Sequence, residues 1–155
     1  MAGLGREAIY SAFFKQLSIL LLDPAGPFGY VGRRSIVPGG LAAELYPAFF
    51  FVEVGEEYQR GVLFSPTKVT LQAHGVIQSL CGQIPDDGAV ADLNNLADAV
   101  EAAVISACGP TQQNTLSGLV QEAWINGRQV TTPATYANRW SQQVMAIEMV
   151  LPHSR

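Results

Sequence analysis

Residues 46 to 68 read YPAFFFVEVGEEYQRGVLFSPTK, and this stretch governs how the rest of the chain is interpreted. The apolar run at residues 49–54 ends at Gly55, and an alternating pattern begins at Lys68. A continuous run of aromatic and β-branched residues is typical of a strand that is covered on both faces. The pattern predicts two strands joined by an arm near residues 55–66, which is too long for a tight turn. We expect this arm to project toward another molecule.

The strand that follows, at residues 68–78, alternates between apolar and polar side chains. One side carries Val69, Leu71, Ala73, Gly75 and Ile77, and the other is mainly polar. Side chains of a strand point alternately to the two faces of a sheet, so one face is expected to be packed and the other wet.

Two helices are predicted. In residues 4–22 apolar side chains recur at helical spacing, and Asp23-Pro24 ends the helix because the residue before proline avoids the helical region. In residues 89–107 one face is traced by Leu93, Leu96, Ala97, Val100, Val104 and Ala107. The Gly109-Pro110 pair is a strong stop signal after this second helix.

Three further strands complete the pattern. Residues 30–37 form a short strand whose Arg33-Arg34 pair is typical of a sheet edge. Residues 119–126 and 142–151 form the last two strands, and a second projecting arm is expected between them near residues 127–141. Residues 142–151 are apolar on both faces, which indicates a central strand or a surface between subunits. The order is α-β-β-β-α-β-β, and residues 1–155 are expected to form a single α+β domain. Its mainly antiparallel or mixed sheet has about five strands, with two helices packed on one face.

Composition limits the classes of function. Of the 155 residues 48% are hydrophobic and 14% are charged, against about 25% charged in typical soluble proteins. Either the core is large or part of the surface is buried against other subunits. The net charge of −4 and the absence of a basic run disfavour direct nucleic-acid binding. The longest apolar runs are shorter than the roughly 20 residues of a membrane span, so no membrane association is expected.

No catalytic or metal-binding pattern is present in the sequence. The two histidines, His74 and His153, are not at ligand spacing with Cys81 or Cys108, and there is no nucleophile elbow of the form GxSxG. The glycines at positions 26, 29 and 32 precede a predicted strand, whereas a phosphate cradle precedes a helix. The sequence therefore predicts no catalytic residues, no cofactor, no metal and no enzyme activity.

The candidate functional residues are instead found in and beside the two arms. Adjacent carboxylates point apart on a strand and rarely share a proton, so the Glu56-Glu57 pair is interpreted as solvated charge or as charge for a partner. Aromatic and arginine side chains in polar loops are common interface anchors, although they also fold back onto a protein's own core. The candidate interface residues are Glu56, Glu57, Tyr58, Arg60, Phe64, Tyr136, Arg139 and Trp140.

Five segments, in this order, resemble one family. They are REAIYSAFF at residues 6–14, PAFFFVE at 47–53, KVTLQA at 68–73, LVQEAWING at 119–127 and AIEMV at 146–150. Together they resemble the tail terminator, or tail completion, proteins of long-tailed bacteriophages. The resemblance covers residues 6 to 151, whereas residues 82–88 and 109–115 carry no family pattern.

The resemblance implies a structural virion protein at the head–tail junction, assembled in the host cytoplasm. Such a protein forms a homohexameric ring that caps the tail tube, ends its polymerisation and offers a docking face to the neck or head-completion protein. DNA passes through the lumen without specific binding, and no cofactor is involved. Two alternatives remain open from the residues: a head-completion or neck connector protein of the same particle, and an unrelated small enzyme or ligand-binding domain.

Overall fold

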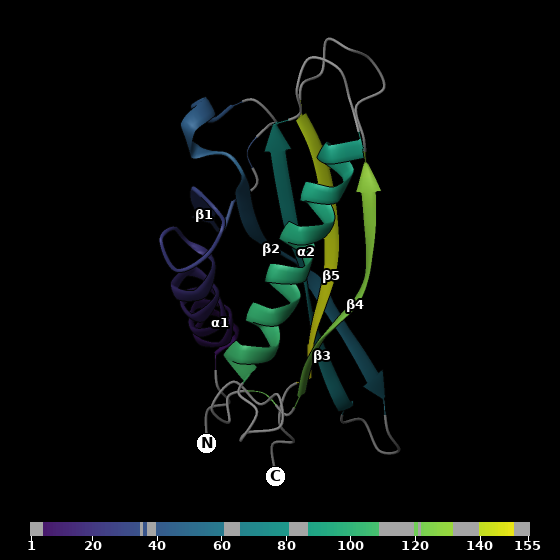
Figure 1. The fold of residues 1–155 in the computed structure, drawn as a ribbon. Coiled ribbons are helices and arrows are strands. Elements are labelled where there is room, and N and C mark those ends of the chain that lie inside the picture. The colour runs from purple at the N-terminus through teal and green to yellow at the C-terminus, as the bar shows by residue number, and fades with distance from the viewer. Residues whose placement is uncertain are drawn as a thin grey trace.

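Two helices lie against a five-stranded mixed sheet in the computed structural model (Figure 1). The structure describes residues 5–34, 36, 40–60, 66–80, 87–108, 120, 122–131 and 140–150. Its elements are α1 (Arg6–Leu21), β1 (Tyr30–Gly32), the 3₁₀ helix η1 (Ala43–Leu45), β2 (Ala48–Arg60), β3 (Pro66–Leu80), α2 (Asp87–Cys108), β4 (Glu122–Thr131) and β5 (Trp140–Val150). The predicted α+β class and element order are confirmed.

The strands are arranged in the order β1-β2-β3-β5-β4. β1 is parallel to β2, and the other three pairs are antiparallel. Because β3 and β4 both run antiparallel to β5, they are parallel to each other, and α2 connects them as in a split βαβ unit. β5 lies between β3 and β4, so its two apolar faces belong to an internal strand of the sheet. β1 is an edge strand, as predicted, but it ends at Gly32, so the Arg33-Arg34 pair follows the strand instead of lying within it.

One face of the sheet carries the main core together with both helices. The buried side chains of α1 recur along one stripe, which comprises Ile9, Tyr10, Phe13, Leu17 and Leu21. They pack with buried residues of α2 (Leu93, Leu96, Ala97, Val100, Ala103 and Val104) and with Phe49, Phe51, Leu71, Ile77 and Ile147 of the strands. A Cβ added at Gly75 would lie 3.0 Å from the Phe49 ring, so the missing side chain makes room for that ring.

The opposite face is partly covered by the chain's own connection between β1 and β2. Ala48, Phe50 and Val76 are buried there, and Tyr30, Ile36, Leu41 and Tyr46 pack against them. The Tyr30 and Phe50 rings lie 5.8 Å apart. Thr70 and Gln78 are also buried on this face of β3, so the expectation of a uniformly wet face is wrong.

α1 ends where the sequence indicated. The N–H of Leu22 still donates to the carbonyl of Ser18 at 3.1 Å, but Leu22 itself is extended and Asp23-Pro24 follows. No helix among the described residues has the length and apolar character that a membrane crossing requires.

Both predicted arms are shorter than expected, because the strands continue into them. β2 runs to Arg60, β4 runs to Thr131, and β5 begins at Trp140. Gly55 and Gly127 do not end their strands. Instead, each lies in a register shift of the ladder, and Gly127 adopts a φ of 109°. Residues 61–65 and 132–139 of the predicted arms lie outside the described part of the chain.

Candidate assembly surface

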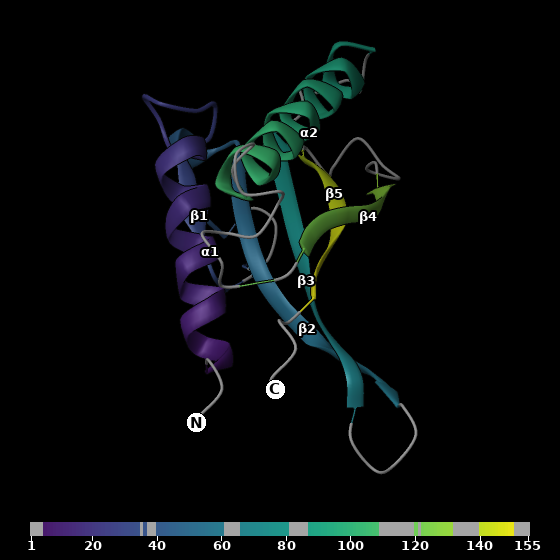
Figure 2. The same cartoon turned by 90° about the horizontal axis from the view of Figure 1, so that it is seen from below.

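The β2–β3 hairpin extends beyond the other described strands (Figure 2). β1 pairs with β2 only over Tyr30–Gly32, and β5 pairs with β3 no further than Thr70. The pairing of β2 with β3 nevertheless continues to Arg60 and Pro66. Residues 58–60 and 66–69 therefore form a two-stranded extension that points away from both helices (Figure 2).

A bulge at Val54 decides which side chains of this hairpin face α1. Glu53 pairs with Ala73 and Gly55 pairs with Gln72, so Val54 is an extra residue on β2. Beyond it Glu56 lies opposite Leu71 and Tyr58 lies opposite Val69, which places both on the face that carries the helices. Glu57 lies opposite Thr70 on the other face. Because the bulge shifts the pairing by one residue, odd positions of β2 face the helices before Val54 and even positions face them after it.

The first residue of α1 binds the hairpin through Glu56 and Tyr58. Arg6 forms an ion pair with Glu56, and its Nη2 donates to the Tyr58 hydroxyl at 3.0 Å. The Tyr58 hydroxyl in turn donates to Oε2 of Glu56. Hydrogen bonding to Glu56 raises the pKa of Arg6, and the same bond lowers the pKa of Glu56. The Tyr58 residue remains 51% exposed, so its hydroxyl is held within the protomer while its ring stays accessible.

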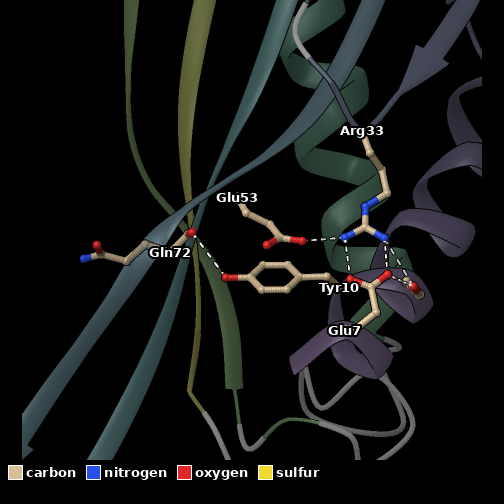
Figure 3. Close-up of polar contacts among 6 residues, drawn as sticks. Glu7, Tyr10, Arg33, Glu53 and Gln72 are labelled. Carbon is tan, nitrogen blue, oxygen red and sulfur yellow. Dashed lines mark hydrogen bonds and ion pairs between the residues drawn. The ribbon is translucent and has the colours of Figure 1, made fainter. Parts of the chain in front are cut away.

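A second ion-pair cluster joins α1 to β2 through Arg33 (Figure 3). Its Nη1 and Nη2 bind Oε1 and Oε2 of Glu7 at 2.5 and 3.1 Å, and Nη2 also lies 2.5 Å from Oε1 of Glu53. Ser11 Oγ donates to Glu7 at 2.6 Å. The hydrogen bond from Arg33, helped by Ser11, lowers the pKa of Glu7 to about 2. This bidentate geometry is the strong form of an arginine–carboxylate pair.

Tyr10 lies beneath this cluster and connects α1 to β3. Its hydroxyl donates to the backbone carbonyl of Gln72 at 3.4 Å (Figure 3). Its ring centroid is 6.1 Å from that of Phe51. Burial raises the pKa of Tyr10 to about 12, and the Glu53 carboxylate adds to the shift. The two ion-pair clusters and Tyr10 thus attach α1 to the base of the hairpin.

The helix-free face of the sheet presents a second surface, which we call the open face. Its residues are half-buried and comprise Val52, Gln72, His74, Trp124, Val144, Ala146 and Glu148. They form rows across the strands, in which His74 lies between Val52 and Ala146, and Glu148 lies between Gln72 and Trp124. Among the side chains that the structure describes on this face, there are carboxylates (Glu148 and the adjacent Glu57) but no lysine or arginine.

The structure places three of the eight predicted interface side chains. Glu56 and Tyr58 are together on the helix side of the hairpin, whereas Glu57 is exposed on the opposite side and accepts a hydrogen bond from Gln72 Nε2 at 3.5 Å. Arg60 ends β2 and Trp140 begins β5, at opposite ends of the sheet, where only their backbone is described. Phe64, Tyr136 and Arg139 lie outside the described residues.

No metal-binding cluster is found in the described ranges. No group of three or more histidine, cysteine, aspartate or glutamate side chains there is arranged to hold a metal ion. His74, the described histidine, has aliphatic Val52 and Ala146 as its cross-strand neighbours. The described surface presents ion pairs, exposed aromatic area and half-buried apolar rows.

Sequence reasoning missed the residues that anchor the hairpin. Arg33 was interpreted only as edge charge, and Arg6, Glu7 and Glu53 were not identified. Arg6 and Glu56 are 50 positions apart in the chain, and Arg33 and Glu53 are 20 apart. Only the parallel pairing of β1 with β2 brings the Arg33 segment to Glu53. The one available signal was a pair of opposite charges, Arg6-Glu7, at the start of an amphipathic helix.

Comparison with known proteins gave no match, either among protein-family models or among curated proteins.

Proposed function

We propose that this chain is a structural subunit of a bacteriophage tail. In this role six copies form a ring that caps the tail tube, ends polymerisation of the tube protein and docks the neck or head-completion protein. The projecting β2–β3 hairpin, with its base attached to α1, is the observation that carries the proposal. The extension continues past the rest of the sheet and Tyr58 at its base is exposed, so it is well placed to contact a neighbour.

The contacts at the base give the hairpin a defined direction. A two-stranded ribbon alone is marginally stable in water. Here Arg6, Arg33 and Tyr10 connect α1 to both hairpin strands, which limits how far the extension can swing. A rigid arm loses less conformational entropy when it binds a partner. This supports a role in docking onto a neighbouring subunit or onto the end of a tube.

The charge of the chain is consistent with a ring through which DNA passes. The net charge is −4, and Glu57 on the hairpin is exposed and has no ion pair among the described residues. An acidic surface repels the DNA backbone. DNA would therefore cross a lumen of this composition without binding to it.

The direct test is electron microscopy of the tail–head junction in purified particles. Six copies at the top of the tail tube are expected. Six copies against the portal, with none on the tube, would instead identify the protein as a neck connector. A particle whose neck contains no copy would contradict both assignments.

The hairpin's part in capping is tested by a matched pair of variants at Tyr58. Tyr58→Ala removes the exposed ring and should leave tubes uncapped and longer when tube protein polymerises with this chain in vitro. Tyr58→Phe keeps the ring and loses only the hydroxyl, whose partners lie within the same protomer, so it should cap normally. Equal capping by both variants would show that the exposed ring plays no part.

A further inference from the structure

We infer that the seam between neighbouring copies joins the open face beside β4 on one copy to the β1 edge of the next, with Glu148 facing Arg34. This inference rests on the proposed function and names the surfaces that close the ring. β1 and β4 are the two ends of the strand order. A contact between unlike patches at opposite edges is heterologous, which is the kind of contact that generates rings.

The open face has the chemistry of one half of such a seam. Glu148 accepts a hydrogen bond from Asn126 at 3.1 Å, and no cation of the described residues pairs with it. It is half-buried in a row with Gln72 and Trp124, next to the aliphatic Ala146. A carboxylate set among apolar and aromatic area favours a cationic partner, because the apolar area excludes water from the pair.

Arg34 provides the complementary charge at the other edge. It is the second residue after β1, is exposed, and has no ion pair within the described ranges. The neighbouring Arg33 is held by Glu7 and Glu53. Leu22 is 41% exposed and bridges to Phe28, just before β1, so the same region also offers apolar area.

The other described cations are less suited to this contact. Arg6 and Arg33 are bound to carboxylates of their own protomer. Arg128 donates to Asn94 on α2, on the helix side of the sheet. Lys15 is exposed on α1, in helical register with Glu7 and Ser11, which contact Arg33, so it is unsuitable as a control position.

Side-chain contacts are favoured over strand addition at this seam. Both available strand edges carry a bulge, at Val54 in β2 and between Ile125 and Arg128 in β4. Bulges and charges at sheet edges discourage the pairing of strands from two molecules. The seam is therefore assigned to side chains of the open face.

A charge swap tests the assignment. Glu148→Arg, Arg34→Glu and the double variant are compared with the wild-type full chain by native mass spectrometry and sedimentation velocity, alone and with tube protein. Each single variant should weaken ring formation by at least about tenfold, because like charges meet at the seam. The double variant should restore the ring. Glu101→Arg, which makes the same charge change as Glu148→Arg at an exposed position on α2, should leave it intact.

The outcomes separate this inference from the function on which it rests. The Glu148–Arg34 seam is wrong if rings still form in both single variants, or if the double variant forms rings as poorly as either single variant. Either result leaves the proposed function standing. A wild-type chain that forms no ring, alone or with tube protein, contradicts both. Circular dichroism shows whether each variant is folded, which separates misfolding from loss of the contact. The neutral variants Glu148→Gln and Arg34→Gln should weaken the ring less than the charge reversals do. If the folded neutral variants weaken the ring as much as the reversals, the proposed seam is wrong.

Discussion

Glu56 and Glu57 are adjacent in the chain but lie in different environments. The strand directs Glu56 to Arg6 on α1 and Glu57 to Gln72 on the opposite face. That the two carboxylates point apart follows from the geometry of any strand, and the sequence predicted it. Strand geometry does not predict the partners of the two carboxylates, because Arg6 is brought to Glu56 by the packing of α1 on the sheet. At the scale of residues, direction was predictable and contact was not.

Gln143 provides a prediction at the same scale. Its side chain is fully buried, and neither polar atom of its amide has a hydrogen-bond partner in the part of the chain that the structure describes. Gln143→Met should raise the free energy of unfolding by about 1–3 kcal/mol, because an unsatisfied buried polar group is removed. Chemical denaturation measures the change.

Gln78 is the matched control for this substitution. It is equally buried and its Oε1 is also unpaired among the described residues, but its Nε2 donates to the carbonyl of Ile36 at 2.9 Å and to Gln142 Oε1 at 3.3 Å. Gln78→Met should therefore lower the stability. If both variants are stabilised equally, general hydrophobicity and not hydrogen-bond satisfaction explains the effect.

At the scale of elements, the helices were predicted more accurately than the strand ends. Periodicity identified α1 and α2 to within a few residues, because each has a continuous stripe of buried side chains. Gly55 and Gly127 were interpreted as breaks, but both β2 and β4 absorb them in bulges and continue. A glycine looks the same in the sequence whether it ends a strand or lies in a bulge. The partner strand makes that difference, and its register was unknown.

The stripe on α2 gives a prediction with a control on the same helix. Leu96→Ala should destabilise the protein by about 2–4 kcal/mol, because Leu96 is buried against the sheet and the change leaves a cavity. Ile105→Ala should have little effect, since Ile105 is 54% exposed. Thermal and denaturant unfolding of the two variants test this. A costly Ile105→Ala would mean that another surface covers this side of α2.

The attachment of α1 to β2 should weaken in acid. The pKa of Glu7 is lowered from 4.5 to about 2, and that of Glu56 is also lowered, so the unfolded chain takes up protons before the folded protein does. Their stabilising contribution is present above the unfolded pKa and is lost as the pH falls toward 2. Melting temperatures should fall over this range, and less so for Glu7→Gln. Glu101→Gln, at an exposed position on α2, should keep the wild-type profile.

At the scale of the whole molecule, the class and the chain order of elements were predictable, but the neighbours in the sheet were not. Nothing in the sequence signalled that β1 would be parallel to β2, or that β5 would insert between β3 and β4. The hairpin was anticipated as a projecting arm because its composition changes at Gly55. The open face was missed because its residues come from β2, β3, β4 and β5, and only the register brings them together.

The topology predicts an order of local stability. β3 has a strand on each side and is buried along most of its length, whereas β1 has three residues and one neighbour. Amides of β3 should exchange with solvent slowest, and those of β1 fastest among the strands. Hydrogen exchange followed by mass spectrometry or NMR measures this order. Equal protection of β1 and β3 would contradict the strand order described here.

The extra residue at Val54 has a consequence for how relatives of this chain could diverge. Without that single position the ladder would run unbroken, because Gly55 already pairs with Gln72 and Glu56 with Leu71, so Glu56, Glu57 and Tyr58 would keep their sides. The bend and added twist of the bulge would be lost, and the outer hairpin would point in a new direction. A one-residue change in length, which leaves composition and fold almost untouched, is thus a simple genetic route to a re-aimed arm.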